Sequence, residues 1–96
     1  MMILVTYDVN TDTAAGRGRL NRIAKECEKV GQRVQKSVFE CSVDAAQKKL
    51  LIGRLLTIMD IKKDSIRIYN LGNSYQSRIE KYGKNETYDP SEVLIV

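Results

Sequence analysis

Residues 2–8, with the sequence Met-Ile-Leu-Val-Thr-Tyr-Asp, form the stretch that decides the fold. Six residues of high β-propensity lead directly into an acid, which predicts a strand at the centre of a sheet. Because side chains alternate along a strand, Asp8 should share one face with Thr6, whereas Tyr7 should point to the other. A rigid strand end is a good place from which to present a carboxylate for chemistry.

A polar, turn-rich loop over residues 9–16 leads into a predicted helix over residues 16–30. Apolar residues recur there at helical spacing, and Gly31 fits the C-cap. Because basic residues at a helix start oppose the helix dipole, the first arginines of this helix do not serve helix stability. The face expected to be exposed carries five cations: Arg17, Arg19, Arg22, Lys25 and Lys29.

Residues 32–43 are predicted to be extended. Two short strands with a tight reversal near residues 35–37 account for this segment, and one bent strand is the alternative. Asp44 and Gln47 then match a capping box, which predicts a second helix that runs to about Met59.

A strand over residues 65–71 completes the order β-α-β-β-α-β. With right-handed crossovers this order is the α+β, ferredoxin-like sandwich, in which a four-stranded antiparallel sheet has both helices on one face. We expect one domain over residues 1–96, with a core over residues 1–72 and a C-terminal extension over residues 73–96. The extension ends in four apolar residues, 93–96, which predict an additional strand that pairs with a sheet edge. The helix-free face, expected to be apolar, favours a homodimer packed through the sheets.

Composition narrows the chemistry. The chain of 96 residues has 16 basic and 12 acidic side chains, and its net charge of +4 favours an anionic partner. It contains no histidine, which excludes a Ser-His triad. Hydrolysis must therefore rely on carboxylates, hydroxyls, arginines, lysines or a hard metal ion. In the absence of a membrane span or signal peptide in the sequence, we expect a cytoplasmic protein in which Cys27 and Cys41 are buried and free.

The candidates for chemistry are two acids and three arginines: Asp8, Asp12, Arg17, Arg19 and Arg33. A strand-end carboxylate beside arginines suits a phosphodiester, because the acid can hold a divalent metal while guanidinium groups hold phosphate oxygens. One aspartate per chain is a poor metal site, but two copies of Asp8 across a two-fold axis could hold one ion.

Each candidate also has a structural interpretation. Asp8 could be a turn former, and Asp12 is more typical of a loop residue than of a ligand. The two helix-start arginines could form an ordinary solvated face. Arg33 could equally pair with an acid such as Glu40 across a hairpin.

Five short motifs in this order resemble the CRISPR-associated protein 2 family: Val5–Val9 (VTYDV), Arg17–Leu20 (RGRL), Gly31–Gln35 (GQRVQ), Ser37–Glu40 (SVFE) and Ser65–Tyr69 (SIRIY). The resemblance covers nearly the whole chain. It implies a small metal-dependent endonuclease and adaptor of spacer acquisition in CRISPR antiviral defence. It also implies a ferredoxin-like homodimer, with one Mg²⁺ or Mn²⁺ shared between the two Asp8 side chains.

The resemblance further implies roles for individual residues. Asp8 matches the catalytic, metal-binding aspartate. Arg17, Arg19 and Arg33 match nucleic-acid-binding positions, and Tyr7, Ser37 and Phe39 match positions near the site. From the pattern alone, Tyr7 and Phe39 are more typical of packing, and Ser37 of a turn.

The family also implies partners, namely a CRISPR integrase subunit and either RNA or double-stranded DNA. Two functions stay open at this point: hydrolysis of phosphodiester bonds, or a DNA-binding structural adaptor that bridges integrase subunits and for which cleavage is dispensable.

Overall fold

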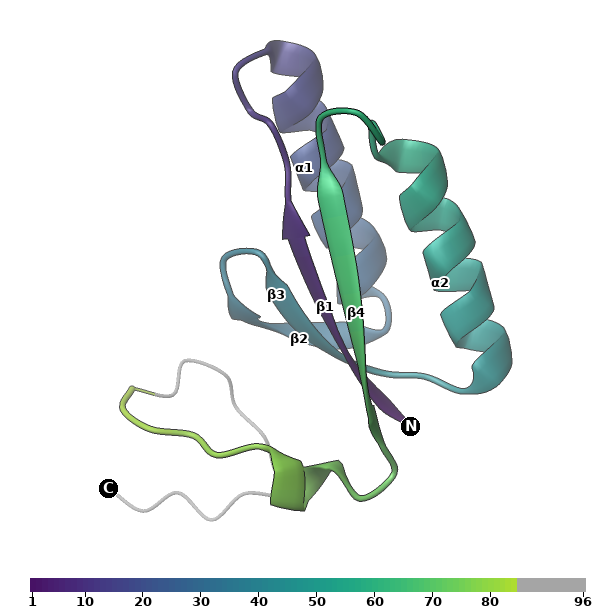
Figure 1. Ribbon diagram of the computed structural model, residues 1–96, viewed down its shortest axis with the longest axis vertical. Helices are drawn as coiled ribbons and strands as arrows, with labels where there is room; N and C mark the ends of the chain where they lie inside the picture. The colour runs from purple at the N-terminus through teal and green to yellow at the C-terminus, as the bar shows by residue number, and fades with distance from the viewer. Residues whose placement is uncertain (85–96) are drawn as a thin grey trace.

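The structure, a computed structural model, describes residues 1–84 (Figure 1). The strand predicted for residues 93–96 therefore lies outside the described residues. Within residues 1–84, neither helix combines the length and the apolar character that crossing a membrane requires. The elements follow the order β1 (Met2–Asp8), α1 (Ala14–Glu28), β2 (Gly31–Gln35), β3 (Val38–Ser42), α2 (Ala45–Ile58), β4 (Ser65–Gly72) and a short 3-10 helix, η1 (Tyr75–Arg78).

The strands form one antiparallel sheet with the order β2-β3-β1-β4, so that β1 is central as predicted. Val5 of β1 lies opposite Phe39 of β3, and Asp8 lies opposite Ser65 of β4. The helices run side by side along one side of the sheet (Figure 1). This arrangement confirms the predicted α+β, ferredoxin-like fold. It also decides between the two alternatives for residues 32–43, which form a two-strand hairpin.

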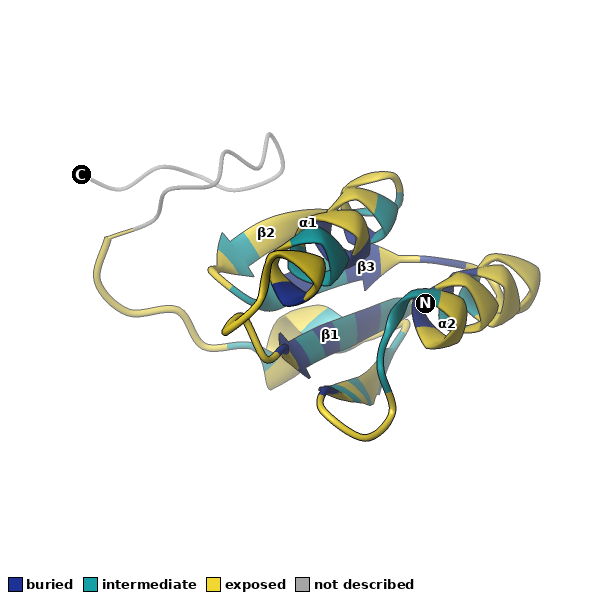
Figure 2. Cartoon of the chain, turned by 90° about the horizontal axis from the view of Figure 1, so that it is seen from above, coloured by how far each residue is buried: buried dark blue, intermediate teal, exposed yellow. Residues whose placement is uncertain are grey.

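The core lies between this sheet face and the helices, where buried positions gather in Figure 2. Ile3, Val5 and Tyr7 are buried on the inner face of β1, in the alternation that its sequence predicts. Cys27 and Cys41 are buried and free, which confirms that prediction.

Both helices begin at a side-chain cap. Thr13 caps α1, because its Oγ1 accepts a hydrogen bond from the Gly16 amide at 3.1 Å. The helix therefore begins two residues before the predicted start. Asp44 caps α2 in the predicted capping box: its Oδ1 accepts from the Gln47 amide at 2.7 Å, and Gln47 Oε1 accepts from the Asp44 amide at 2.9 Å.

The second face of the sheet is left open by both helices. Its composition is mixed, whereas the sequence predicted an apolar face. Tyr69 is 45% exposed on this face, and its neighbours in the ladder are both apolar and charged. By register, the open face carries Leu4, Thr6, Asp8, Val38, Glu40, Arg67 and Tyr69.

Candidate metal and nucleic-acid site

Asp8 lies at the carboxyl end of β1, on the open face of the sheet, and is exposed. Its backbone is held on both sides. On one side, the amide of Tyr7, the residue before Asp8, donates a hydrogen bond to the Ser37 carbonyl at 3.1 Å. On the other side, Asp8 pairs with Ser65 of β4. Ser37 therefore serves the turn between β2 and β3 beside the end of β1. No hydrogen bond or ion pair within residues 1–84 engages the Asp8 carboxylate.

The described part of one chain offers Asp8 no cluster of further side chains with which to ligate a metal ion. Within residues 1–84, no cluster of three or more acidic, cysteine or histidine side chains could hold one. Mg²⁺ is often bound by one or two carboxylates, with water completing its octahedral shell. The oxygen donors of two Asp8 side chains, one from each copy of a symmetric dimer, therefore fit Mg²⁺ or Mn²⁺.

Tyr7 and Phe39 lie on the inner face of the sheet, opposite to Asp8. Their rings stack with centroids 6.3 Å apart, and Phe39 is fully buried. Burial raises the pKa of Tyr7, whose Oη is enclosed without a hydrogen-bond partner among the described residues. Both residues therefore belong to the core, as their pattern suggested.

Arg33 also lies on the inner side. Its guanidinium carbon is 5.2 Å from the centroid of the Phe39 ring, and its Nη2 is 3.6 Å from Oε1 of Glu28 in α1. The pairing with Glu40 that we considered does not form, because Glu40 lies opposite Gln32 and faces the other way. The structure thus separates Arg33 from Asp8 by the thickness of the sheet.

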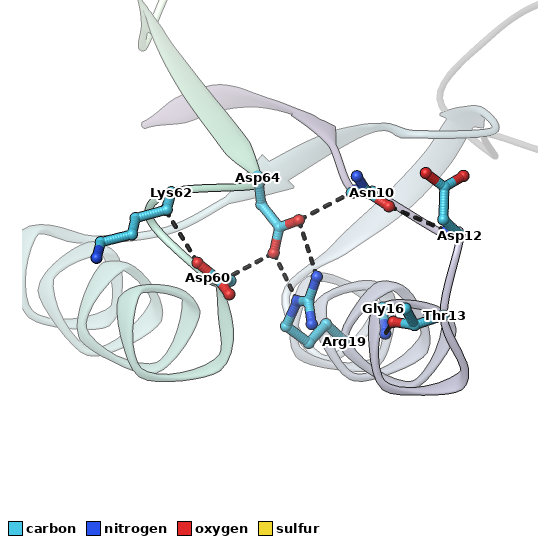
Figure 3. Close-up of polar contacts among 8 residues, drawn as sticks. All are labelled: Asn10, Asp12, Thr13, Gly16, Arg19, Asp60, Lys62 and Asp64. Atoms are coloured by element: carbon cyan, nitrogen blue, oxygen red, sulfur yellow. Dashed lines mark hydrogen bonds and ion pairs between the residues drawn. The ribbon is translucent and has the colours of Figure 1, made fainter.

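Arg19 is not part of the exposed face of α1, and that prediction was wrong. Its side chain is only 12% exposed and forms an ion pair with Asp64, with Nε 2.7 Å from Oδ2 (Figure 3). Asp64 is 45 residues away in sequence, so no local pattern could indicate the contact. Arg17 is exposed as predicted, and its Nη1 donates to the Thr11 carbonyl at 3.2 Å.

Asp12 is a loop residue, as we weighed from the sequence. Its amide donates to Asn10 Oδ1 at 3.0 Å, while its carboxylate points away from the polar contacts drawn in Figure 3.

The sequence reasoning missed Arg67. Arg67 lies opposite Thr6, which is two residues before Asp8 in β1. Arg67 and Asp8 are therefore diagonal neighbours on the open face of the sheet. Its Nη1 is 3.4 Å from the Tyr69 hydroxyl, and the residue is exposed. The signal was available in the alternation of β4, which places Ser65, Arg67 and Tyr69 on one face.

The surface around Asp8 is open. A hollow of about 760 Å³, lined in part by Met2, Ser42 and Tyr75, lies at the opposite end of β1. That end is roughly 20 Å from Asp8, given the rise per residue of a strand. Small-molecule sites are usually concave, whereas a carboxylate on an open sheet face suits a long polymer.

Fold and site together define a class: small ferredoxin-like proteins that carry one exposed carboxylate at the end of the central strand, on the sheet face left open by the helices. The model of the family described as CRISPR associated protein Cas2 matches residues 1–79. The chain belongs to the Cas2 family, which confirms the resemblance.

Individual relatives agree over their full length. The chain is 56% identical to the CRISPR-associated endoribonuclease Cas2 of Chlorobaculum tepidum over 96 residues, with complete coverage of both chains. It is 46% identical to the CRISPR-associated endonuclease Cas2 of Halalkalibacterium halodurans, with 99% of each chain covered. The crystal structure of Streptococcus pyogenes Cas2 superposes with a TM-score of 0.78 at 58% identity, covering 86% of this chain and 100% of that chain. The predicted class of function, a CRISPR-associated nuclease, is the one in these names.

Proposed function

We propose that this chain acts as a homodimeric, metal-dependent endonuclease of CRISPR spacer acquisition, which hydrolyses phosphodiester bonds in RNA or double-stranded DNA. The observation that carries the proposal is the position of Asp8. It is an exposed carboxylate at the end of the central strand, on the open sheet face, in a member of the Cas2 family.

The open face also supports the proposed dimer. Packing two such faces across a two-fold axis would bring the two β1 ends, and hence both Asp8 side chains, to the same interface. When bound there, Mg²⁺ or Mn²⁺ would supply an activated water and stabilise charge on the phosphate. The mixed polar and apolar side chains of this face suit an interface that must also admit a nucleic acid.

The residues of the chain have distinct parts in this proposal. Asp8 from each copy holds and orients the metal ion. Arg67, on the same face, is placed to hold a phosphate oxygen or to offset the developing negative charge. Arg17, exposed at the start of α1, is available to hold the strand further from the reacting bond.

Cleavage of RNA and of duplex DNA tests the enzyme proposal. We expect hydrolysis with Mg²⁺ that stops on addition of EDTA and in Asp8→Asn. Asp12→Asn is the matched control, because it removes the same charge from an exposed loop residue whose carboxylate points away from the contacts of Figure 3. Cleavage that persists in Asp8→Asn, or that survives EDTA, would place the activity elsewhere.

A second function, that of a structural adaptor, is favoured by exposed cations along α1 and at its C-cap that one cleavage site does not require: Arg17, Arg22, Lys25 and Lys29. In this alternative the dimer lies along duplex DNA and bridges two copies of the CRISPR integrase subunit in the cytoplasm. Spacer acquisition in cells that carry Asp8→Asn separates the two functions. Normal acquisition supports the adaptor, and loss of acquisition supports the nuclease.

A further inference from the structure

The carboxylate of Asp64 gathers hydrogen bonds from three segments of the chain (Figure 3). Its Oδ2 accepts from Arg19 Nε at 2.7 Å and from the Asp60 amide at 2.9 Å. Its Oδ1 accepts from the Asn10 amide at 3.0 Å and from Arg19 Nη2 at 3.2 Å. The side chain is fully buried, and these bonds fill the acceptor capacity of both oxygens. The pKa of Asp64 is held at about 2, chiefly by the hydrogen bonds from Arg19.

These contacts involve residues close to Asp8 in the chain and in the sheet, but none of them involves Asp8 itself. Asn10 follows Asp8 by two residues in the chain, and Ser65, the partner of Asp8 across the ladder, directly follows Asp64. Asp64 therefore fixes the backbone beyond Asp8 and the strand beside it. The Asn10 carbonyl packs against Gly16 so closely that no Cβ would fit there. The loop after β1 is thus anchored near its start, at Asn10.

Such an arrangement is better suited to setting geometry than to adding stability. A buried ion pair is often no more stabilising than well-packed apolar residues of similar volume. A functional constellation, in contrast, must be held within about 0.5 Å of its working geometry. In a two-fold dimer any displacement of Asp8 occurs twice, so a shared metal ion is especially sensitive to it.

We propose that the Asp64–Arg19 pair positions Asp8, and that Arg19 serves the site through Asp64 instead of binding phosphate. This inference rests on the proposed metal site between two Asp8 side chains. Two donor atoms of Arg19 are committed to Asp64, and its side chain is 12% exposed. Phosphate contact through these atoms would therefore require breaking the buried pair. Arg17, near the same end of α1 and exposed, is the matched arginine for comparison.

Two readouts on the full-length protein test the proposal without relying on turnover. The first is Mn²⁺ affinity, followed by electron paramagnetic resonance. We expect Asp64→Asn and Arg19→Ala each to weaken it about tenfold or more, as loss of a residue supporting a metal ligand typically does. Because the two residues act as one unit, the variant that carries both substitutions should bind Mn²⁺ no more weakly than either single variant. The second readout is the salt dependence of duplex binding.

The salt dependence separates positioning from phosphate contact. Arg17→Ala should remove two phosphate contacts per dimer and flatten the log–log slope by about 1.8. Arg19→Ala should leave the slope unchanged. A slope flattened as much by Arg19→Ala as by Arg17→Ala would make Arg19 a phosphate ligand and overturn the proposal.

Asp8→Asn distinguishes failure of this inference from failure of the site on which it rests. Mn²⁺ binding that is lost in Asp8→Asn but keeps its wild-type affinity in Asp64→Asn would overturn the positioning role alone. Mn²⁺ affinity that is unchanged in Asp8→Asn would overturn the proposed metal site and the positioning role together. If circular dichroism shows that Asp64→Asn is unfolded, Arg19→Lys takes its place. That variant keeps the charge but not the two-donor geometry, and wild-type affinity in the folded variant would contradict the proposal.

Discussion

At the scale of single residues, Asp64 is a fully buried carboxylate that accepts four hydrogen bonds. Its neutral replacement, Asp64→Asn, leaves the Arg19 guanidinium without its buried counter-charge. Breaking one partner of a buried pair typically costs several kcal/mol, so we expect the free energy of unfolding to fall by about 3 kcal/mol. Urea unfolding at neutral pH measures this, and Asp12→Asn, at an exposed loop position, should change it by less than about 0.5 kcal/mol. Equal effects of the two substitutions would contradict the role of the buried pair.

The same pair predicts an acid transition. Hydrogen bonds from Arg19 lower the pKa of Asp64 to about 2, below its value in the unfolded chain. A lowered pKa in the folded state stabilises the protein where the carboxylate is ionised in both states, above about pH 4 to 5. That stabilisation is lost as the pH falls toward 2. The difference in unfolding free energy between wild type and Asp64→Asn should therefore be constant from pH 5 to 7 and shrink below pH 4. A constant difference down to pH 2 would contradict this assignment.

Replacement of Arg67 tests whether this residue contacts the phosphate that is cleaved. It is the arginine that the sheet register places on the face of Asp8. We expect Arg67→Ala to lower kcat by roughly 100- to 1,000-fold, the range for removal of a group that stabilises developing charge. Arg54→Ala is the control, because Arg54 lies on α2, is 57% exposed and forms only a surface pair with Glu26 at 3.5 Å. Steady-state cleavage with a labelled duplex measures both, and comparable losses in the two variants would remove Arg67 from the site.

At the scale of elements, the sequence predicted those features of the helices and strands that depend on neighbouring residues. The alternation of β1, the stripe of α1 and the capping box of α2 each involve residues only a few positions apart. What the sequence could not predict depends on distant partners. The contact of Arg19 with Asp64 spans 45 residues, and Arg33 faces the helices because of its register against Phe39. The start of α1 was misplaced because Thr13 lies inside a polar run, where its role as a cap is not distinctive.

Helix α1 offers a matched pair of glycines. A Cβ at Gly16 would collide with the Asn10 carbonyl, whereas a Cβ at Gly18 would meet nothing within 4 Å. Gly18→Ala should therefore stabilise the protein by roughly 0.5–1 kcal/mol through helix propensity alone. Gly16→Ala should destabilise it, because the loop after β1 must move. Thermal unfolding of the two variants compares them directly, and the opposite order of melting temperatures would contradict the anchored loop.

At the scale of the whole molecule, the proposed metal site depends on the assembly of two chains. One chain presents one exposed Asp8 carboxylate on an open sheet face, and no cluster of metal ligands occurs within residues 1–84. The metal site that we propose would therefore need the Asp8 side chains of two copies. The segment that we expected to pair with a sheet edge, residues 93–96, belongs to the part of the chain beyond the described residues. Its role is still a prediction: deletion from Glu92 onward should weaken the dimer in sedimentation experiments. A truncated chain that is fully dimeric would assign the segment to another partner.

The stoichiometry of Mn²⁺ binding tests the central claim most directly. Titration of the purified protein, with its molar mass determined in the same solution, should give one Mn²⁺ per two chains. Asp8→Asn should abolish this binding, and Asp12→Asn should leave both affinity and stoichiometry as in the wild type. One ion bound per chain, or an undiminished ion in Asp8→Asn, would contradict a metal site shared between the two Asp8 side chains.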